Sequence, residues 1–153
     1  MTRDASFKDG AARPLRLRAL DGDDLAVIAA ITQDAVFPVK EMRWDRRARR
    51  FALLINRFRW EDGAQSAERV QSVLAFEDVM AVQSQGIDKA DADLVCSLLS
   101  ISFTRATDGA GRVELTLAGD GAIALQVEAL EVLLRDVTQP YAAPSGKAPR
   151  HPD

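Results

Sequence analysis

The chain has 153 residues, of which 47% are hydrophobic and 28% are charged, and its net charge at pH 7 is −3. This balance is typical of a soluble globular protein with a single core. One cysteine, Cys96, excludes an intrachain disulfide, and the only histidine, His151, lies near the C-terminus. The composition therefore argues against Ser-His-Asp and Cys-His catalysis and against histidine-ligated zinc or iron. No apolar stretch approaches the ~20 residues of a membrane span, and the N-terminus lacks the apolar region of a secretory signal, so we expect a cytoplasmic protein.

The first predicted elements are a strand and a helix. Apolar and basic residues alternate over 15–19, which is typical of a half-buried strand. Residues 22–34 keep helical spacing, and Asp21 or Asp23 is suited to cap the helix N-terminus. Residues 1–13, before these elements, show no such pattern and are expected to form a flexible arm.

A β-hairpin is predicted next. Residues 39–44 and 49–60 are the two strands, and residues 45–48 form the turn between them. The second strand begins apolar on both faces and then alternates. This pattern indicates a strand that is covered on both sides at one end, or a bulge near Asn56.

The C-terminal half predicts further strands and a final helix. Residues 69–87 are rich in valine and leucine, and residues 76–78 indicate a bend between two strand pieces. In 128–140, Leu130, Leu133, Leu134 and Val137 keep helical spacing, with Pro140 at the end. Glycine-containing turns separate three more strands, at 94–106, 112–119 and 122–127.

These elements together predict an α+β fold. We expect mainly an antiparallel curved sheet or partly open barrel, similar to that of pleckstrin-homology domains, with one helix in the N-terminal half and one at the C-terminus. Residues 14–139 would form a single globular domain. Residues 140–153 would form a disordered tail, because three of the six prolines fall within 141–153.

Four segments of the chain resemble a known family. The segment INRFRWE at 55–61 does so most distinctively, together with 33–39, 76–88 and 123–137. In combination they are similar to a bacterial family of domains of unknown function, over roughly residues 14–140. The resemblance implies a bacterial cytoplasmic protein without an assigned activity.

Arginine is concentrated in one segment. Residues 40–60 carry a net charge of +6, whereas the rest of the chain carries −9. Guanidinium groups bind phosphate and carboxylate with paired hydrogen bonds, so the segment predicts an anion-binding or acidic-protein-binding patch. A solvated hairpin whose charge pairs with the acidic remainder is the favoured alternative. Nucleic acid is disfavoured, because the sequence pI is near 5.2.

Within this segment, Arg57 and Arg59 are the most specific candidates for binding an anion or a partner. In a strand they share one face at a separation of about 7 Å, while Phe58 and Trp60 would face the core. Cross-strand pairing with acids is the alternative role of the two arginines. The other two tentative binding residues, Arg43 and Arg50, flank the turn.

The sequence offers no catalytic residue, no metal-ligating set and no cofactor motif. The segment TDGAG contains two glycines, but it joins two predicted strands, so a phosphate-binding loop is not expected there. The segment DKADAD lacks the central glycine and the closing glutamate of a calcium-binding loop. We therefore favour a non-catalytic interaction or assembly domain with a basic hairpin face, which binds a protein or self-associates. The alternatives are a small enzyme or binder of an anionic metabolite that uses arginine and carboxylates, and weak nucleic-acid binding.

Overall fold

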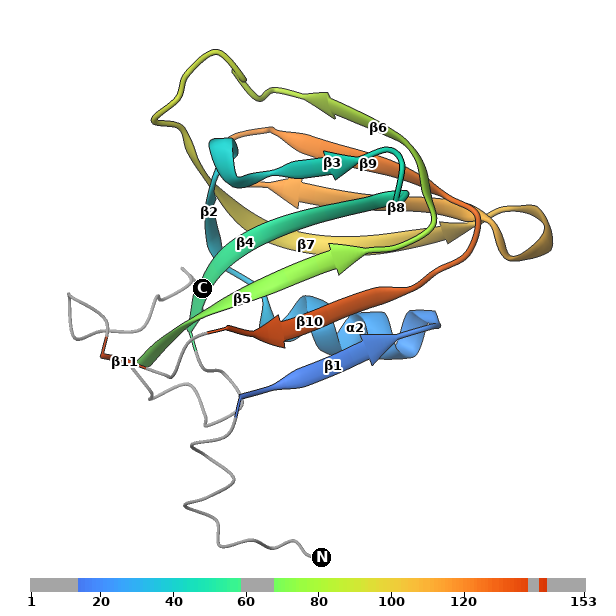
Figure 1. The fold of residues 1–153 in the computed structure, drawn as a ribbon, viewed down its shortest axis with the longest axis horizontal. Helices are drawn as coiled ribbons and strands as arrows, with labels where there is room; N and C mark the ends of the chain where they lie inside the picture. Colours follow the sequence, from blue (N-terminus) through green and yellow to red (C-terminus); the bar gives the residue numbers. More distant parts are fainter. Residues whose placement is uncertain (1–13, 59–67, 138–140, 143–153) are drawn as a thin grey trace, which may run out of the picture.

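A computed structural model describes residues 14–58, 68–137 and 141–142 (Figure 1). These residues form eleven strands, one α-helix and two short 3-10 helices. In chain order the elements are β1 (Arg16–Ala19), α2 (Gly22–Ile31), β2 (Val36–Pro38), η1 (Val39–Glu41), β3 (Arg43–Asp45), β4 (Arg50–Phe58), β5 (Glu68–Phe76), β6 (Val79–Gln85), β7 (Val95–Arg105), η3 (Thr107–Gly109), β8 (Gly111–Leu117), β9 (Ala122–Val127), β10 (Val132–Asp136) and β11 (Tyr141–Ala142).

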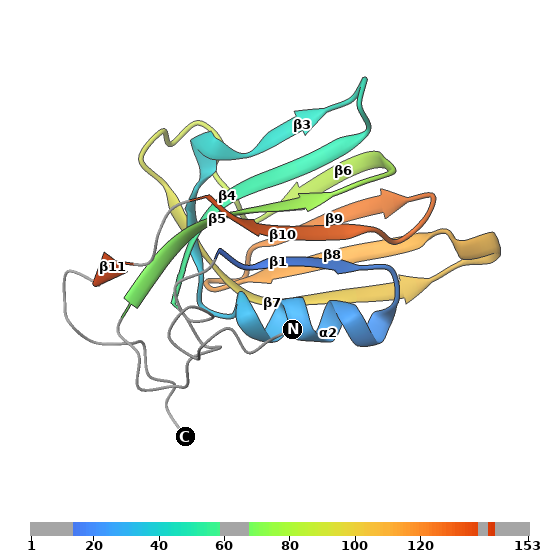
Figure 2. The ribbon, with the colours of Figure 1, turned by 60° about the horizontal axis from the view of Figure 1, so that its bottom comes forward.

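The strands form one antiparallel sheet that curls around the core. Its spatial order is β1, β10, β5, β4, β2, β7, β8, β9 and β6, with β3 added to β4 and β11 added to β5. Strand β2 joins the two halves, because Val36 pairs with Asn56 of β4 on one side and with Ser97 of β7 on the other. The half that contains β4, β5 and β10 therefore faces the half that contains β7, β8 and β9 (Figures 1 and 2).

Two bends in the chain close the sheet at a common corner. Strand β5 continues into β6 and β9 continues into β10, while β5 pairs with β10 and β6 pairs with β9. At the corner the amide of Glu77 donates to the carbonyl of Glu131, and the amide of Glu128 donates to the carbonyl of Asp78. Asp78 has a positive φ of 56°. The bend predicted at 76–78 is thus confirmed.

The single helix closes one end of the sheet. Asp21 caps it by accepting a hydrogen bond from the amide of Asp24 at 2.9 Å. Leu25 and Ile28 are buried in the core, and the helix packs against β1 and β7 (Figure 2). The predicted N-terminal-half helix is present but ends at Ile31.

The predicted C-terminal helix is wrong, and with it the α+β fold class. Residues 132–136 are strand β10, which pairs with β1 and β5, and the described residues are mostly antiparallel sheet with one α-helix. Val132, Leu134 and Asp136 are buried, which is the period-two pattern of a strand. Leu133 lies half-buried on the other face of the strand. Because this residue is also apolar, Leu130, Leu133, Leu134 and Val137 happened to match helical spacing as well. Without this helix the likeness to pleckstrin-homology domains loses its basis.

The predictions for the second hairpin strand and for the two ends of the chain can also be compared with the structure. The register of β4 with β5 runs unbroken from Phe51 to Phe58, so the alternative of a bulge near Asn56 is wrong. The expected arm at 1–13 lies outside the described residues, as does the tail at 140–153 apart from Tyr141 and Ala142. Among the described residues, no helix is long and apolar enough to cross a membrane.

Candidate functional site

Arg57 is in the core, not on the surface where the sequence placed it. Its side chain is fully buried, so the predicted exposed pair with Arg59 is wrong for Arg57, and Arg59 lies outside the described residues. The inward face of β4 carries Phe51, Leu53 and Ile55, and the same alternation places Arg57 inside. The role of Arg57 and Arg59 in binding a partner stays a prediction.

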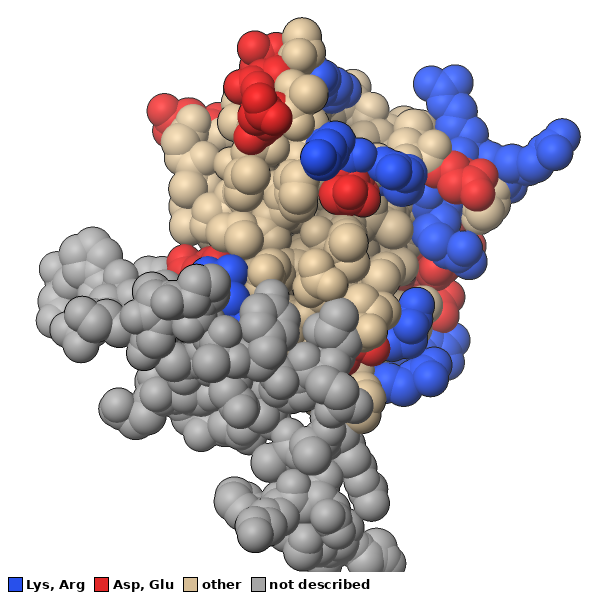
Figure 3. Space-filling view, turned by 60° about the vertical axis from the view of Figure 1, so that its left-hand side comes forward, with Lys and Arg blue, Asp and Glu red and all other residues tan. Residues whose placement is uncertain are grey.

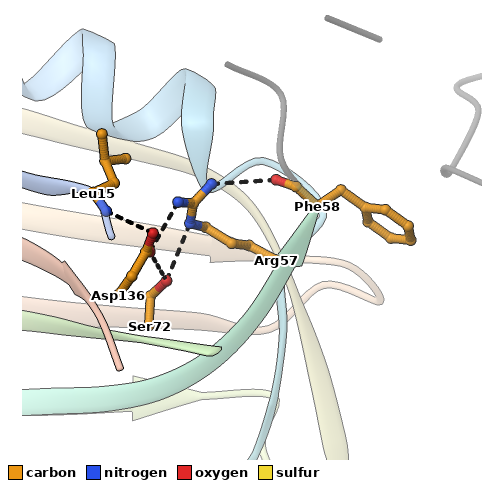
Figure 4. Close-up of polar contacts among 5 residues, drawn as sticks. All are labelled: Leu15, Arg57, Phe58, Ser72 and Asp136. Atoms are coloured by element: carbon orange, nitrogen blue, oxygen red, sulfur yellow. Dashed lines mark hydrogen bonds and ion pairs between the residues drawn. The ribbon is translucent and has the colours of Figure 1, made fainter. Parts of the chain in front are cut away.

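Buried polar partners surround the Arg57 guanidinium (Figure 4). It donates to the Asp136 carboxylate at 2.9 Å, to the Ser72 hydroxyl at 3.1 Å and to the Phe58 carbonyl at 3.3 Å. The Ser72 hydroxyl also donates to Asp136 at 2.7 Å, and the amide of Leu15 donates to its second oxygen at 2.8 Å. The cluster therefore joins β4, β5 and β10 to the residue before β1, and its contacts are those of a structural link.

Phe58 is buried, but on the face of β4 opposite to the inward-facing Arg57, so the prediction that it faces the core is wrong. The two side chains point to opposite faces of β4, and the guanidinium of Arg69 lies 4.3 Å from the centre of the Phe58 ring. This cation–π contact covers a face that the alternation alone would expose. Trp60, the other predicted core aromatic residue, lies outside the described residues.

Three of the five arginines in the segment 43–51 already have acidic partners. Arg49 contacts Glu128 at 2.6 Å and Arg50 contacts Glu77 at 2.7 Å, whereas Arg43 lies 3.9 Å from Glu41. The hydrogen bond and the charge of Glu77 raise the pKa of Arg50 above its usual value. Figure 3 shows basic side chains gathered along one flank with acidic ones among them. Two of the tentative binding residues, Arg43 and Arg50, are thus engaged within the chain.

Arg46 and Arg47, at the tip of this hairpin, differ from the other three. Neither side chain has an ion-pair or hydrogen-bond partner among the described residues. The turn itself is held by local bonds, because the Asp45 carboxylate accepts from the amide of Ala48 at 3.0 Å. Both arginines are exposed, so their charge is available to a ligand.

A pocket opens beside this hairpin. Its volume is about 500 Å³, and it lies between β3, β6 and the loop that leads to β7, with Phe51 of β4 and Ile123 of β9 in its wall. Most of its lining is apolar. The apolar residues are Val39, Met42, Trp44, Phe51, Val82, Ala92 and Ile123, and the polar ones are Lys40, Arg46, Ser84, Lys89 and Asp91.

The charge around the pocket is mainly positive. Lys40, Arg46 and Lys89 line it, and within the described part of the chain none of these side chains has an ion-pair or hydrogen-bond partner. Asp91 is the one acid in the lining, and it accepts a hydrogen bond from the amide of Asp93. A mainly apolar cavity with three cations and one acid is suited to a ligand that is apolar in one part and anionic in another.

Sequence reasoning missed this pocket, because its cations are far apart in the chain. Lys40 precedes β3 and Lys89 follows β6, and each is a lone basic residue in a polar setting. One signal was present: Trp44 adjoins the arginine-rich turn, and a half-buried tryptophan beside cations often marks a binding surface.

One comparison with known proteins identifies a family. No curated protein and no solved structure matches the chain. A family model described as protein of unknown function (DUF2948) matches residues 15–151, which is most of the chain and includes every described helix and strand. This agrees with the resemblance found in the sequence. The chain therefore belongs to the DUF2948 family of proteins of unknown function.

Proposed function

We propose that the protein is a non-catalytic binding domain, and that the pocket beside the basic hairpin is its binding site. The observation that carries this proposal is the set of three cations, Lys40, Arg46 and Lys89, which have no partner among the described residues and surround a mainly apolar cavity of about 500 Å³. The ligand class that fits is an amphipathic anion, with an apolar body and a carboxylate, sulfonate or phosphate group.

The two parts of the ligand contribute differently to binding. Ion pairs with exposed lysine and arginine contribute only about 0–1 kcal/mol each. Apolar burial contributes about 25 cal/mol per Å². Burial of roughly 150 Å² of ligand surface therefore contributes more binding free energy than all three ion pairs together. The apolar wall therefore supplies most of the affinity, while the cations select the sign of the ligand's charge.

A pair of loop variants tests whether the pocket binds. The probe is 8-anilinonaphthalene-1-sulfonate, an anion with an apolar body whose fluorescence rises on binding. Ala92 lines the pocket and Ala90 does not, although both lie on the same exposed loop. We expect A92W to weaken the apparent Kd at least tenfold and A90W to leave it unchanged. Equal binding by both variants, with native circular dichroism, would overturn the proposal.

A second pair tests the charge. We expect the double variant R46A/K89A to bind the probe several-fold more weakly and with less dependence on salt. The matched control is R16A, because Arg16 is an exposed arginine on β1, at the other end of the strand order. The same loss in R16A would show that overall charge, and not the pocket, attracts the probe.

A further inference from the structure

Two strand edges face each other next to the pocket. Among the described strands, β6 pairs only with β9, and β3 pairs only with β4. A groove of about 450 Å³ separates them, with Trp44 and Arg46 on one side and Val79–Val82 on the other. Trp44, Arg46 and Val82 also line the pocket, so the groove and the pocket form one continuous depression.

The edge of β6 lacks the usual protection against pairing. Its seven residues, VMAVQSQ, include no charged residue and no proline, and the side chain of Met80 is 52% exposed. Edge strands normally carry charges, proline or bulges that prevent further pairing. The bulge in β6 lies at its start, between Val79 and Ala81, and leaves the rest regular. The opposite edge strand, β1, carries Arg16 and Arg18.

We propose that β6 receives an extended segment of a partner protein, in which apolar and acidic residues alternate. The segment would lie in the groove as an added antiparallel or parallel strand and pair with the backbone groups of β6 that point away from β9, beyond Val79, whose amide bonds to the carbonyl of Arg49. Because side chains of a strand alternate between its faces, every second residue would enter the apolar pocket. This inference rests on the proposed function for the use of the pocket, and on the edge of β6 for the backbone pairing.

The charge of the surroundings selects an acidic partner. Arg46 and Arg47 at the hairpin tip, together with Lys89, are cations without partners among the described residues. The residues of an added strand that do not enter the apolar part of the pocket would lie along its rim, beside Arg46 and Lys89, with Arg47 at the adjoining hairpin tip. Acidic residues at these positions would offset the cations and steer the encounter between the two proteins.

Two other occupants fit this depression less well. A second copy of this chain that paired through its own β6 would bring VMAVQSQ, which carries no acid to offset the cations. The chain's own residues 143–153 include Pro144, Pro149 and Pro152, and proline has no amide hydrogen to donate to a neighbouring strand.

A seven-residue peptide that alternates glutamate and leucine is the probe, matched in length to β6. Fluorescence anisotropy would measure its Kd for the full chain. We expect binding that weakens at least tenfold when lysine replaces glutamate, or when the same residues are reordered with the leucines together. R46E should also weaken it at least tenfold, whereas R16E should change it less than twofold.

Backbone methylation of the peptide separates strand addition from attachment by side chains. N-methylation of alternate residues removes the amide donors along one edge of the added strand. We expect one of the two methylated registers to abolish binding. Unchanged binding in both registers would overturn the inference.

The outcomes separate this inference from the proposed function. If the naphthalene sulfonate binds in the pocket and the peptide does not bind, strand addition is overturned and the proposed function stands. If neither binds, both fail. Concentration-dependent dimers in analytical ultracentrifugation that the peptide does not dissociate would assign the edge to a second copy and would also overturn the inference.

Discussion

Arg57 and Asp136 form an ion pair, with 2.9 Å between Nη2 and Oδ1, in which the arginine side chain has no solvent exposure and the aspartate side chain has 4%. The pair connects β4 to β10 across β5, and Ser72 of β5 bonds to both side chains. Buried ion pairs contribute little net stability compared with apolar packing, but loss of one partner leaves the other charge buried. The pair and Ser72 therefore link the side chains of three neighbouring strands, β4, β5 and β10.

Single and double substitutions at this pair should differ. We expect R57M and D136N each to lower the free energy of unfolding by about 3–5 kcal/mol, because each leaves one buried charge without its partner. The double variant R57M/D136N buries no charge, keeps an acceptor for the amide of Leu15 and places an amide donor beside the Ser72 hydroxyl oxygen, so it should lose at least about 1 kcal/mol less than the sum. Urea denaturation followed by circular dichroism measures all three, and strict additivity would contradict the pairing.

The strand at 132–136 predicts a sharp difference between two adjacent leucines. Leu134 is 1% exposed in the core, whereas Leu133 is half-buried on the opposite face. We expect L134A to lower the free energy of unfolding by about 2–5 kcal/mol, and L133A to lower it by less than half as much. Thermal or urea denaturation provides the comparison. Equal losses would instead support the helical spacing, in which both leucines share one face.

Two glycines should respond oppositely to alanine. A Cβ on Gly111 would lie 2.5 Å from both the Phe103 ring and the Thr104 carbonyl oxygen, so G111A should destabilise the protein by about 1–3 kcal/mol. A Cβ on Gly22, in the first turn of α2, would meet no atom within 4 Å. G22A should therefore stabilise the protein by about 0.4–1 kcal/mol, because alanine restricts the unfolded chain. Melting temperatures that shift in the same direction would contradict this.

The thiol of Cys96 should resist alkylation at neutral pH. Burial against the core raises its pKa, because a thiolate is poorly solvated there. The folded state therefore holds the proton more tightly than the unfolded state, and it loses this stabilisation as the pH rises above the thiol's unfolded value of about 8.5. Iodoacetamide reaction rates measured against pH should show a midpoint above ~8.5 for the native protein and a return to ~8.5 in urea. An identical midpoint in both states would contradict the burial.

Local pattern was sufficient for much of the sheet but not for strand β10. The alternation at 15–19, the cap at Asp21 and the bend at 76–78 are local signals, and each is confirmed. Residues 128–137 carry leucines that satisfy both a helical and a strand spacing. The choice between them depends on β1 and β5, which offer hydrogen-bond partners on both sides of β10. Tertiary pairing outweighs local spacing in such a case.

The candidate site also depends partly on local sequence and partly on contacts between distant segments. The high density of arginine at 43–50 is visible in the sequence. Which of these charges are neutralised depends on Glu77 and Glu128, which the fold brings next to the hairpin. The charge of Arg57 favours an exposed position, whereas the alternation of β4 that it continues places its side chain inside. A buried arginine requires an acid on another strand, and no spacing within one segment reveals that acid.

The pairing of β1 with β10 has a consequence for synthesis of the chain. Arg16 pairs with Arg135, and the amide of Leu15 bonds to Asp136, so the first described strand has its strand neighbour near the end of the described chain. A ribosome adds about 5–20 residues per second, so β1 leaves the exit tunnel several seconds before β10 exists. Until β10 emerges, β5 lacks one of its strand neighbours and β1 lacks the strand with which it pairs. The part of the sheet that contains β1 is therefore completed only after β10 has left the ribosome.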